Sequence, residues 1–480
     1  MPRSTAFDAR ALPAYKAPSA GAPMNAPARP TTAPTRPLWQ SYLIFLGPLI
    51  LANVLQGLSG TVNSVYIGQM IGVNALAAVS SFFPIFFFLI SFVIGLGAGA
   101  SVLIGQAFGA REPERVKAVA GTTLTTTVAA SVVIAILGAV FTEPLLRAVG
   151  TPDNVFSDAV GYARIMMLAM PLFFVLIVMT SMMRGVGDTV TALYAFVSIN
   201  AIGLAVTPVF IRGWLGPSLG VASAAWAALV SFTVTFTGLW FYMRRRGHPL
   251  APDAALFRHL KIEPRLLLTV LRIGVPTGIQ VVLLALAEVA VLSFVNAFGS
   301  NATAAYGAVN QVVSYVQFPA ISIAITASIF GAQAIGRGNA AGLGKITRTG
   351  ILLNIVITGA LVLLAYLFSR SLIGFFITDP AVMELAHRLL QITLWSYVVF
   401  GAAGVVSGIM RASGTVLIPT TLSVLAVLGI EVPVAYFLSK TTLGIDGIWI
   451  AYPVAFSAML LMQSAYYWFV WRKKTITRLI

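Results

Sequence analysis

One carboxylate interrupts an apolar run in the second half of the chain. Glu288 lies within "LLALAEVAVLSFV" (residues 283–295), where Ser293 is the other polar residue. A charged side chain at bilayer depth costs at least about 2.5–3.5 kcal/mol on insertion scales, so such residues are rare and usually functional. A carboxyl group there could exchange a proton near neutral pH, or bind Na⁺, since hard cations favour oxygen ligands. Glu288 is therefore the first candidate for ion coupling. The alternative is a permanently protonated group that hydrogen-bonds a neighbouring helix.

Two polar residues precede Glu288 in the same apolar segment. Thr277 lies eleven positions earlier, which places it about 20° from Glu288 on a helical wheel. Gln280 lies more obliquely to the same line. The spacing predicts one polar strip, made of Thr277, Gln280 and Glu288, as the ion-coupling site.

The next apolar segment carries a second line of polar residues. In "YGAVNQVVSYVQFP" (306–319), polar side chains recur every three or four residues and so share one helical face. We predict that they form a wall of the substrate cleft beside Glu288; packing between helices is the alternative. The residues are Tyr306, Asn310, Ser314 and Gln317.

The first apolar segment has a polar strip of its own. Its members fall within about a third of the helix circumference and are Asn53, Gln56, Gly60, Asn63 and Ser64. We predict that Gln56 and Asn63 line the cleft. The competing interpretation is interhelical hydrogen bonding, worth about 0.6 kcal/mol per bond on average.

Glu431 is the other acidic residue well inside an apolar segment. It lies in "GIEVPVAYF" (429–437), next to Pro433. Two interpretations stand: an ion pair with Arg388 or Lys440, or a position facing the interface between the two halves of the chain. Glu431 is therefore a less certain site residue than Glu288.

Composition places these residues in a membrane protein. The chain of 480 residues is 58% hydrophobic and 9% charged, whereas ordinary soluble domains are about 25% charged. It has no cysteine, and its three histidines lie in or beside polar connections. Disulfides and thiolate chemistry are thus excluded, and no metal site is expected within the membrane. A membrane enzyme is disfavoured for the same reasons. No GxxxxGK[ST] motif for ATP is present, and no cofactor is expected beyond a coupling ion.

Twelve apolar segments reach the length of about 20 residues that a membrane-spanning helix needs. Six precede and six follow the polar stretch at 244–265. We therefore predict an all-α membrane protein with an N-lobe (38–243), a basic cytoplasmic linker (244–265) and a C-lobe (266–471). The spans are predicted at 40–67, 75–107, 117–141, 159–183, 189–211, 219–243, 266–298, 302–335, 347–369, 384–410, 416–439 and 446–471.

The basic residues set the orientation of these spans. If both termini are cytoplasmic, 24 of the 30 Lys and Arg residues lie on the cytoplasmic side and six on the other. This asymmetry predicts an inner-membrane protein with a disordered cytoplasmic tail (1–37) and a cytoplasmic C-terminus (472–480). The net charge of +16 thereby follows from topology, so nucleic acid is not an expected partner.

The two halves repeat each other at a shift of about 227 residues. "IGQAFGA" (104–110) corresponds to "FGAQAIG" (330–336), and "SMMRGVGDT" (181–189) to "GIMRASGTV" (408–416). Because each half has an even number of spans, the copies share one topology and form a parallel repeat. Two lobes enclosing a central cleft are the usual layout for alternating access.

Several motifs together resemble the multidrug and toxic-compound extrusion (MATE) family. They are "VNSVYIGQMIGVNALAAVS" (62–80), "GQAFGA" (105–110), "MRGVGDT" (183–189), "GVASAAWA" (220–227) and "DGIWIAYP" (446–453). The resemblance covers residues 38–471 and implies a twelve-helix, two-lobe exporter driven by inward movement of H⁺ or Na⁺. It also implies small, cationic amphipathic substrates; we expect a monomer.

The resemblance bears on single residues as well. Family members with a glutamate in the stretch of Glu288 use it in ion coupling. They usually carry an aspartate at the position of Asn63, and often one at the position of Thr207, before the proline of the fifth span. Here both positions hold neutral residues, which we expect to act as uncharged ligands. At Glu431 the family pattern often has a basic residue.

A flippase for a lipid-linked saccharide, from the same superfamily, is the alternative function. A long anionic headgroup calls for several basic side chains in the cleft. The basic residues here lie at the ends of the predicted spans, with Arg272 a mild exception. This distribution favours cation export.

Overall fold

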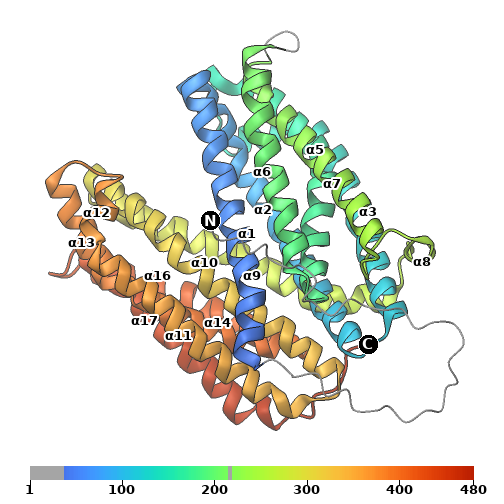
Figure 1. Cartoon of the computed structure of the whole chain (residues 1–480). Coiled ribbons are helices and arrows are strands. Elements are labelled where there is room, and N and C mark those ends of the chain that lie inside the picture. Colours follow the sequence, from blue (N-terminus) through green and yellow to red (C-terminus); the bar gives the residue numbers. More distant parts are fainter. Residues whose placement is uncertain (1–36, 215–218) are drawn as a thin grey trace, which may run out of the picture. The chain divides into compact units, whose positions relative to one another are not determined.

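The computed structural model describes residues 37–214 and 219–480, apart from the side chains at positions 59, 61 and 62. The tail predicted at 1–37 lies, except for Pro37, outside the described residues. Residues 38–480 form one compact unit. Its regular structure is helical throughout the described part of the chain (Figure 1).

Twelve helical spans among the described residues are long and apolar enough to cross a membrane, which confirms the predicted number. The N-lobe contains α1 (Leu38–Met70), α2 (Val73–Gly109), α3 (Pro113–Val140), α5 (Asp153–Gly185), α6 (Thr189–Arg212) and α7 (Ala222–Arg246). The C-lobe begins with α9 (Pro264–Asn296), α10 (Ser300–Gly336) and α11 (Leu343–Leu367).

Two of the remaining C-lobe spans are interrupted helices. The tenth combines α13 (Pro380–Thr393) and α14 (Ser396–Ala412), and the eleventh combines α15 (Leu417–Ala426), a π-helical turn (Val427–Glu431) and α16 (Val432–Ser439). The last span is the continuous helix α17 (Ile445–Phe469). Short helices lie between the spans: α4 (Thr142–Ala148), α8 (Ala254–Arg258), α12 (Ser369–Gly374) and the 3₁₀ turn Ala340–Gly342. A second 3₁₀ turn, Trp471–Lys473, follows the last span.

The helix boundaries confirm the internal repeat. Both α2 and α10 are 37 residues long, and they begin 227 positions apart, at residues 73 and 300. The backbone repeats as well: Arg111 has a φ of +62°, the left-handed conformation that Gly338, 227 positions later, adopts at +76°. This conformation is sterically strained for a non-glycine residue. Arg111 nevertheless adopts the same turn as Gly338, its equivalent in the repeat.

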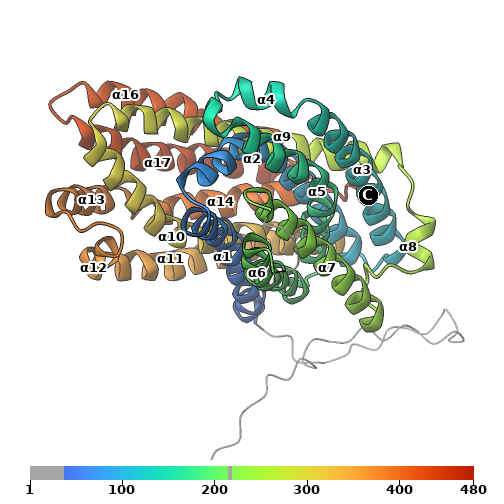
Figure 2. The same ribbon diagram turned by 90° about the horizontal axis from the view of Figure 1, so that it is seen from above.

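The two lobes meet along α2, which packs against both α9 and α10 (Figures 1 and 2). Glycines allow the close approach. A Cβ added at Gly95 would lie 2.2 Å from the carbonyl oxygen of Gly274, and one at Gly99 would lie 2.4 Å from that of Val270. Small residues at such crossings are a common device of membrane helices, because close backbone packing replaces the missing hydrophobic drive.

These contacts all fall in one half of the spans. They involve the C-terminal half of α2, the N-terminal half of α9 and the C-terminal half of α10. These three half-helices lie at the same end of the helix bundle. We call this the junction end; it also contains Gln106, Gly109, Gln333 and Gly336. The residues around Glu288 lie in the opposite halves of α9 and α10.

Candidate functional site

Glu288 on α9 is held by two tyrosine hydroxyls from other helices. Its Oε2 accepts a hydrogen bond from the hydroxyl of Tyr306 on α10 at 2.6 Å and one from Tyr452 on α17 at 3.3 Å. The two hydroxyl oxygens are 3.0 Å apart. Hydrogen bonds to a carboxylate are shorter and stronger than neutral ones, so the 2.6 Å bond identifies Tyr306 as the principal partner of Glu288.

The tyrosines are buried, whereas the carboxylate is exposed. Tyr306 and Tyr452 are 5% and 4% exposed, and the Tyr306 ring stacks on Trp449 with centroids 5.9 Å apart. The side chain of Glu288, in contrast, is exposed. Buried donors therefore hold a carboxylate that is uncovered by protein on its other side.

The hydroxyls can respond to the protonation of Glu288. Each tyrosine hydroxyl has one proton to donate and can also accept. While Glu288 is ionised, both hydroxyls can point toward it. Once it is protonated, it becomes a donor itself, and the bonds among Glu288, Tyr306 and Tyr452 must rearrange. The cluster can thus register one proton as a change of hydrogen-bond direction.

A small cavity adjoins this cluster. Its volume is about 10 Å³, which is close to the space that one water molecule needs. Five polar side chains line it together with Val309, Val313 and Leu389: Tyr306, Asn310, Thr393, Tyr397 and Tyr452. The cavity places Asn310, a predicted cleft residue, in the same site as Glu288.

The polar strip predicted on α9 has three different sets of neighbours. Thr277 is 5% exposed beside Gly278 at the crossing with α2, and its hydroxyl donates to the carbonyl of Ile273 at 2.9 Å. Gln280 accepts a bond of 3.4 Å from Thr420 on α15. The wheel angle places Thr277 and Glu288 on one face, but eleven residues rise by about 16 Å. Among the described contacts, neither Thr277 nor Gln280 reaches Glu288.

The wall predicted on α10 is divided in the same way. Tyr306 and Asn310 belong to the Glu288 site. Ser314 donates a hydrogen bond to the carbonyl of Asn310 at 2.8 Å. Gln317, two helical turns after Asn310, is half-buried. In the part of the chain that the structure describes, neither residue contacts the carboxylate.

The polar residues predicted in the N-lobe form a separate pair. The hydroxyl of Thr207 on α6, which is fully buried, donates to Oδ1 of Asn63 on α1 at 3.5 Å. Gln56 is exposed on α1. Asn63 and Thr207 are thus neighbours of each other, with no described contact to the C-lobe cluster.

Glu431 ends the π-helical turn of the eleventh span and is 2% exposed. Of the two interpretations, the ion pair is absent from the contacts of the described residues: Arg388 pairs with Asp446, and Lys440 contacts the hydroxyl of Tyr436 at 2.5 Å. Single π turns occur often at functional sites. The Glu431 segment packs against α9 and α17, the helices that carry Glu288 and Tyr452.

The sequence analysis did not single out Tyr452 or Tyr397. Tyr452 lies inside the "DGIWIAYP" motif, so its position was visible but its partner, 164 residues away, was not. A phenol in an apolar span seeks a hydrogen-bond partner when buried. That tendency was the one available signal.

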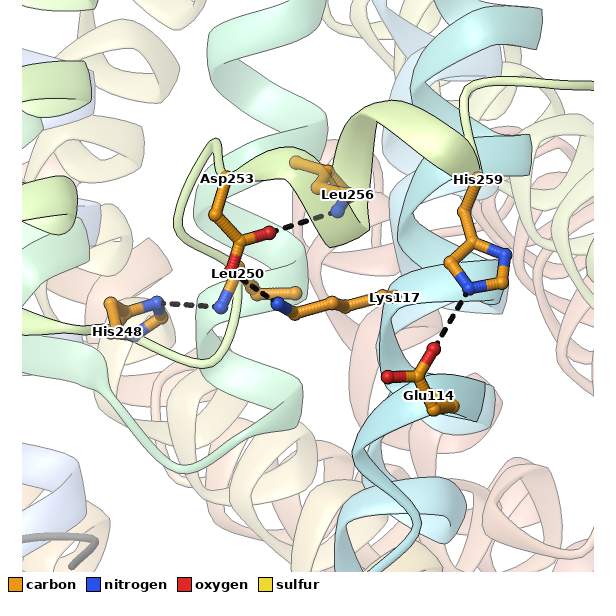
Figure 3. Close-up of polar contacts among 7 residues, drawn as sticks. All are labelled: Glu114, Lys117, His248, Leu250, Asp253, Leu256 and His259. Atoms are coloured by element: carbon orange, nitrogen blue, oxygen red, sulfur yellow. Dashed lines mark hydrogen bonds and ion pairs between the residues drawn. The ribbon is translucent and has the colours of Figure 1, made fainter. Parts of the chain in front are cut away.

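A second polar cluster fastens the connection between the lobes to the N-lobe (Figure 3). Lys117 on α3 pairs with Asp253, whose other oxygen caps α8 through the backbone N–H of Leu256 at 2.9 Å. His259 Nε2 lies 3.1 Å from Glu114. Burial raises the pKa of Asp253, but hydrogen bonds and the charge of Lys117 outweigh it, and the net pKa is lowered.

His248 anchors the other end of this connection. Its Nδ1 accepts the backbone N–H of Leu250 at 3.1 Å, so that nitrogen is unprotonated, and Nε2 faces Asp188 at 3.3 Å. Burial raises the pKa of Asp188, yet bonds from His248 and Thr191 outweigh it and lower the pKa. No cluster of three possible metal-ligating side chains occurs within the described ranges.

Comparisons with known proteins agree with this architecture. The family model described as MatE matches twice, at residues 48–209 and 276–437, once in each lobe. A probable multidrug resistance protein of Bacillus subtilis, YoeA, is 51% identical over 445 residues, covering 92% of this chain and 96% of that protein. The multidrug export protein MepA of Staphylococcus haemolyticus is 25% identical over 384 residues, covering 78% and 82%.

Solved structures share the fold. One, an outward-facing conformation of a multidrug resistance MATE family transporter, superposes with a TM-score of 0.82 at 22% identity and covers 89% of this chain and 94% of that one. Another, of a Vibrio cholerae MATE transporter, gives a TM-score of 0.84 at 20% identity, covering 91% and 98%.

Proposed function

Because this chain belongs to the MATE family of transporters, we propose that it exports small amphipathic organic cations by antiport with a coupling ion, preferentially H⁺. The observation that carries the proposal is the exposed carboxylate of Glu288, held at spanning depth by the hydroxyls of Tyr306 and Tyr452. The printed names of YoeA and MepA, which refer to multidrug resistance and export, support the substrate class.

The coupling step follows from the charge of Glu288. The ionised carboxylate attracts a cationic substrate. When it takes up a proton from outside, the negative charge disappears and the hydroxyl bonds rearrange, so the substrate is released. The protein then changes from the outward-facing to the inward-facing conformation, and the proton leaves toward the cytoplasm. The ionised carboxylate can then bind the next cation.

The energy available to this cycle depends on the charge of the substrate. Each elementary charge that crosses 100 mV yields about 2.3 kcal/mol, so a proton that enters across about 150 mV provides roughly 3.5 kcal/mol, enough for a several-hundred-fold gradient of a neutral substrate. Exchange of one proton for one monovalent cation moves no net charge, and the pH difference across the membrane then drives export.

The orientation is part of the same proposal. The excess of Lys and Arg in the connections at the junction end favours the cytoplasm on that side. The lobes are then joined toward the cytoplasm, and the half that carries Glu288 faces outward. Alternating access would consist of parting the lobes at the junction end and joining them at the other.

Sodium is the rival coupling ion, because carboxylate and hydroxyl oxygens also suit a hard cation. The presence of one accessible carboxylate in the cluster favours H⁺. The flippase alternative gains no support from the relatives named above. The proposed location is the inner membrane, that is, the plasma membrane, and the proposed working unit is the monomer.

The test is transport in proteoliposomes. Efflux of ethidium is measured under an imposed pH gradient and then under a Na⁺ gradient, for the parent chain, for Glu288→Gln and for Glu384→Gln. Glu384 is a matched control, an exposed glutamate that pairs with Arg370 at 3.8 Å outside the site. We expect efflux to follow the pH gradient, to vanish in Glu288→Gln and to persist in Glu384→Gln. Efflux that survives Glu288→Gln would refute the coupling role.

A further inference from the structure

Two glutamines cross between the lobes at the junction end. Gln106 and Gln333 occupy equivalent positions of the repeat, 227 residues apart, near the end of α2 and α10. The amide of Gln106 donates to the carbonyl of Ala412 at 2.8 Å, and that of Gln333 donates to the carbonyl of Gly185 at 3.0 Å. The acceptors are also 227 residues apart. Each glutamine therefore binds a backbone carbonyl of the other lobe, and the two carbonyls occupy equivalent positions of the repeat.

The backbones touch at the same place. A Cβ added at Gly109 would lie 2.2 Å from the carbonyl oxygen of Gln333, and one added at Gly336 would lie 2.0 Å from that of Gln106. Gln106 is 1% exposed and Gln333 is 7% exposed. The lobes cannot part at this end without breaking the two buried hydrogen bonds that the side chains of Gln106 and Gln333 donate.

The symmetry fails at the other oxygen of each glutamine. Oε1 of Gln333 accepts a hydrogen bond of 3.2 Å from Arg337, the residue that directly follows α10. The repeat equivalent of Arg337 is Ala110, which has no side-chain donor. Oε1 of Gln106 instead accepts the backbone N–H of Leu479 at 2.8 Å. A segment 373 residues away thus supplies the donor that the N-lobe lacks.

The segment that contains Leu479 bridges the two lobes. On the C-lobe side, Trp471 Nε1 donates to Ser413 at 3.0 Å, and the side chain of Leu479 packs on Gly414, where an added Cβ would meet it at 2.7 Å. On the N-lobe side, Arg478 pairs with Glu112 at 2.9 Å. The C-terminal mark lies beside α3 in the view from above (Figure 2).

We propose that residues 476–480 act as a clamp that keeps the lobes joined at the junction end, with Gln106 as the positioning residue that it secures. This proposal rests on the alternating access proposed above. The clamp is bound by one backbone hydrogen bond, one half-exposed ion pair and the half-buried side chains of Ile476, Leu479 and Ile480. Residues 476–480 lie outside every helix, so they can leave without unfolding any span. Its release is the step that frees Gln106 and allows the lobes to part on this side.

The absence of cysteine from the chain makes a distance measurement direct. Cysteines introduced at Arg245 (end of α7) and Lys345 (start of α11), both exposed, carry spin labels, and electron–electron double resonance reports the distance between the lobes in lipid. Leu479→Pro removes the N–H donor, and Leu479→Ala keeps it. Arg478→Glu reverses one charge of the ion pair, and Arg478→Glu with Glu112→Arg restores the pair in the opposite sense.

Loss of one hydrogen bond changes an equilibrium by roughly two- to tenfold. We expect Leu479→Pro to raise the ratio of parted to joined lobes by about fivefold on that basis. Arg478→Glu should raise it less, the doubly reversed pair should return it to the parent value, and Leu479→Ala should raise it less than Leu479→Pro.

Two comparisons keep this proposal separate from the proposed function. If Gln106→Ala parts the lobes but Leu479→Pro and Arg478→Glu leave the distances unchanged, the clamp is refuted while alternating access stands. If Gln106→Ala, Leu479→Pro and Arg478→Glu all leave the distances unchanged, both the clamp and the parting of the lobes at this junction are refuted. If Glu288→Gln leaves efflux intact while Leu479→Pro shifts the distances, the coupling role fails and the clamp is supported.

Discussion

The hydroxyl of Tyr306 lies 2.6 Å from the carboxylate of Glu288, although the two residues belong to different helices. The tyrosine is buried and stacked on Trp449, whereas the carboxylate is exposed. A buried donor therefore faces an exposed acceptor. In the proposed mechanism, this bond lets the C-lobe influence the charge and orientation of Glu288.

Tyr306→Phe tests that control by removing the donor alone. Hydrogen bonds to charged groups contribute about 1.5–3 kcal/mol, so we expect proton-driven efflux to slow by roughly ten- to a hundredfold and its pH profile to shift. Tyr315→Phe, at an exposed tyrosine of the same helix, is the matched control and should keep the parent rate. An unchanged pH profile in Tyr306→Phe would show that the bond has no part in coupling.

Tyr452→Phe should be milder, because its hydroxyl is 3.3 Å from Glu288. The hydroxyls of Tyr306 and Tyr452 also bond each other at 3.0 Å, so their effects should not add. In a double-mutant cycle we expect the free-energy loss of the double variant, RT ln of its efflux-rate ratio to the parent, to be smaller than the sum of the two single losses. Strict additivity of these free energies, measured at one pH, would mean that the two tyrosines act independently.

The crossing of α2 and α9 predicts opposite effects for two identical substitutions. Gly95→Ala places a methyl group 2.2 Å from the carbonyl oxygen of Gly274, whereas Gly161→Ala on α5 meets nothing within 4 Å. In a helix interior alanine is preferred over glycine by up to about 1 kcal/mol. We expect Gly95→Ala to lower the thermal unfolding midpoint in detergent by several degrees and Gly161→Ala to leave it unchanged or raise it. Equal midpoints would mean that the lobes are not packed at Gly95.

The spans and the repeat were predictable because both are local properties of the sequence. Each span is a run of apolar residues, and the correspondence of "IGQAFGA" with "FGAQAIG" needs no knowledge of packing. The pairing of Gln106 with Ala412 and of Gln333 with Gly185 was not predictable. A repeat shows that two positions are equivalent, but it does not show which atoms of the other lobe they reach.

The site was predicted only in part, for a geometric reason. The helical wheel predicted that Thr277, Gln280 and Glu288 share one polar strip of α9, but a wheel discards the rise along the axis. Thr277 consequently lies at the junction with α2, Gln280 beside α15 and Glu288 beside α10 and α17. Tyr452 was missed because its contact joins residues far apart in the sequence.

Asp188 predicts how stability depends on pH. It caps α6 by accepting the backbone N–H of Thr191 at 2.9 Å and faces His248. Its pKa in the folded protein is lowered, because hydrogen bonds from His248 and Thr191 outweigh the effect of burial. A carboxyl group of this kind stabilises the fold fully above its unfolded pKa of about 3.9, and loses that contribution as the pH falls through the lowered folded pKa.

Two variants separate the charge of Asp188 from its capping role. Asp188→Ala removes both, and loss of an N-cap costs about 0.5–2 kcal/mol. Asp188→Asn keeps a good cap and removes the charge, so we expect a smaller loss at pH 7. Thermal unfolding midpoints measured from pH 7 to pH 3 should show the gap between the parent chain and Asp188→Asn narrowing below about pH 4, because there the unfolded chain binds the proton more readily than the folded one. A gap that stays constant over this range would mean that the charge of Asp188 does not contribute, and that its value lies in the cap alone.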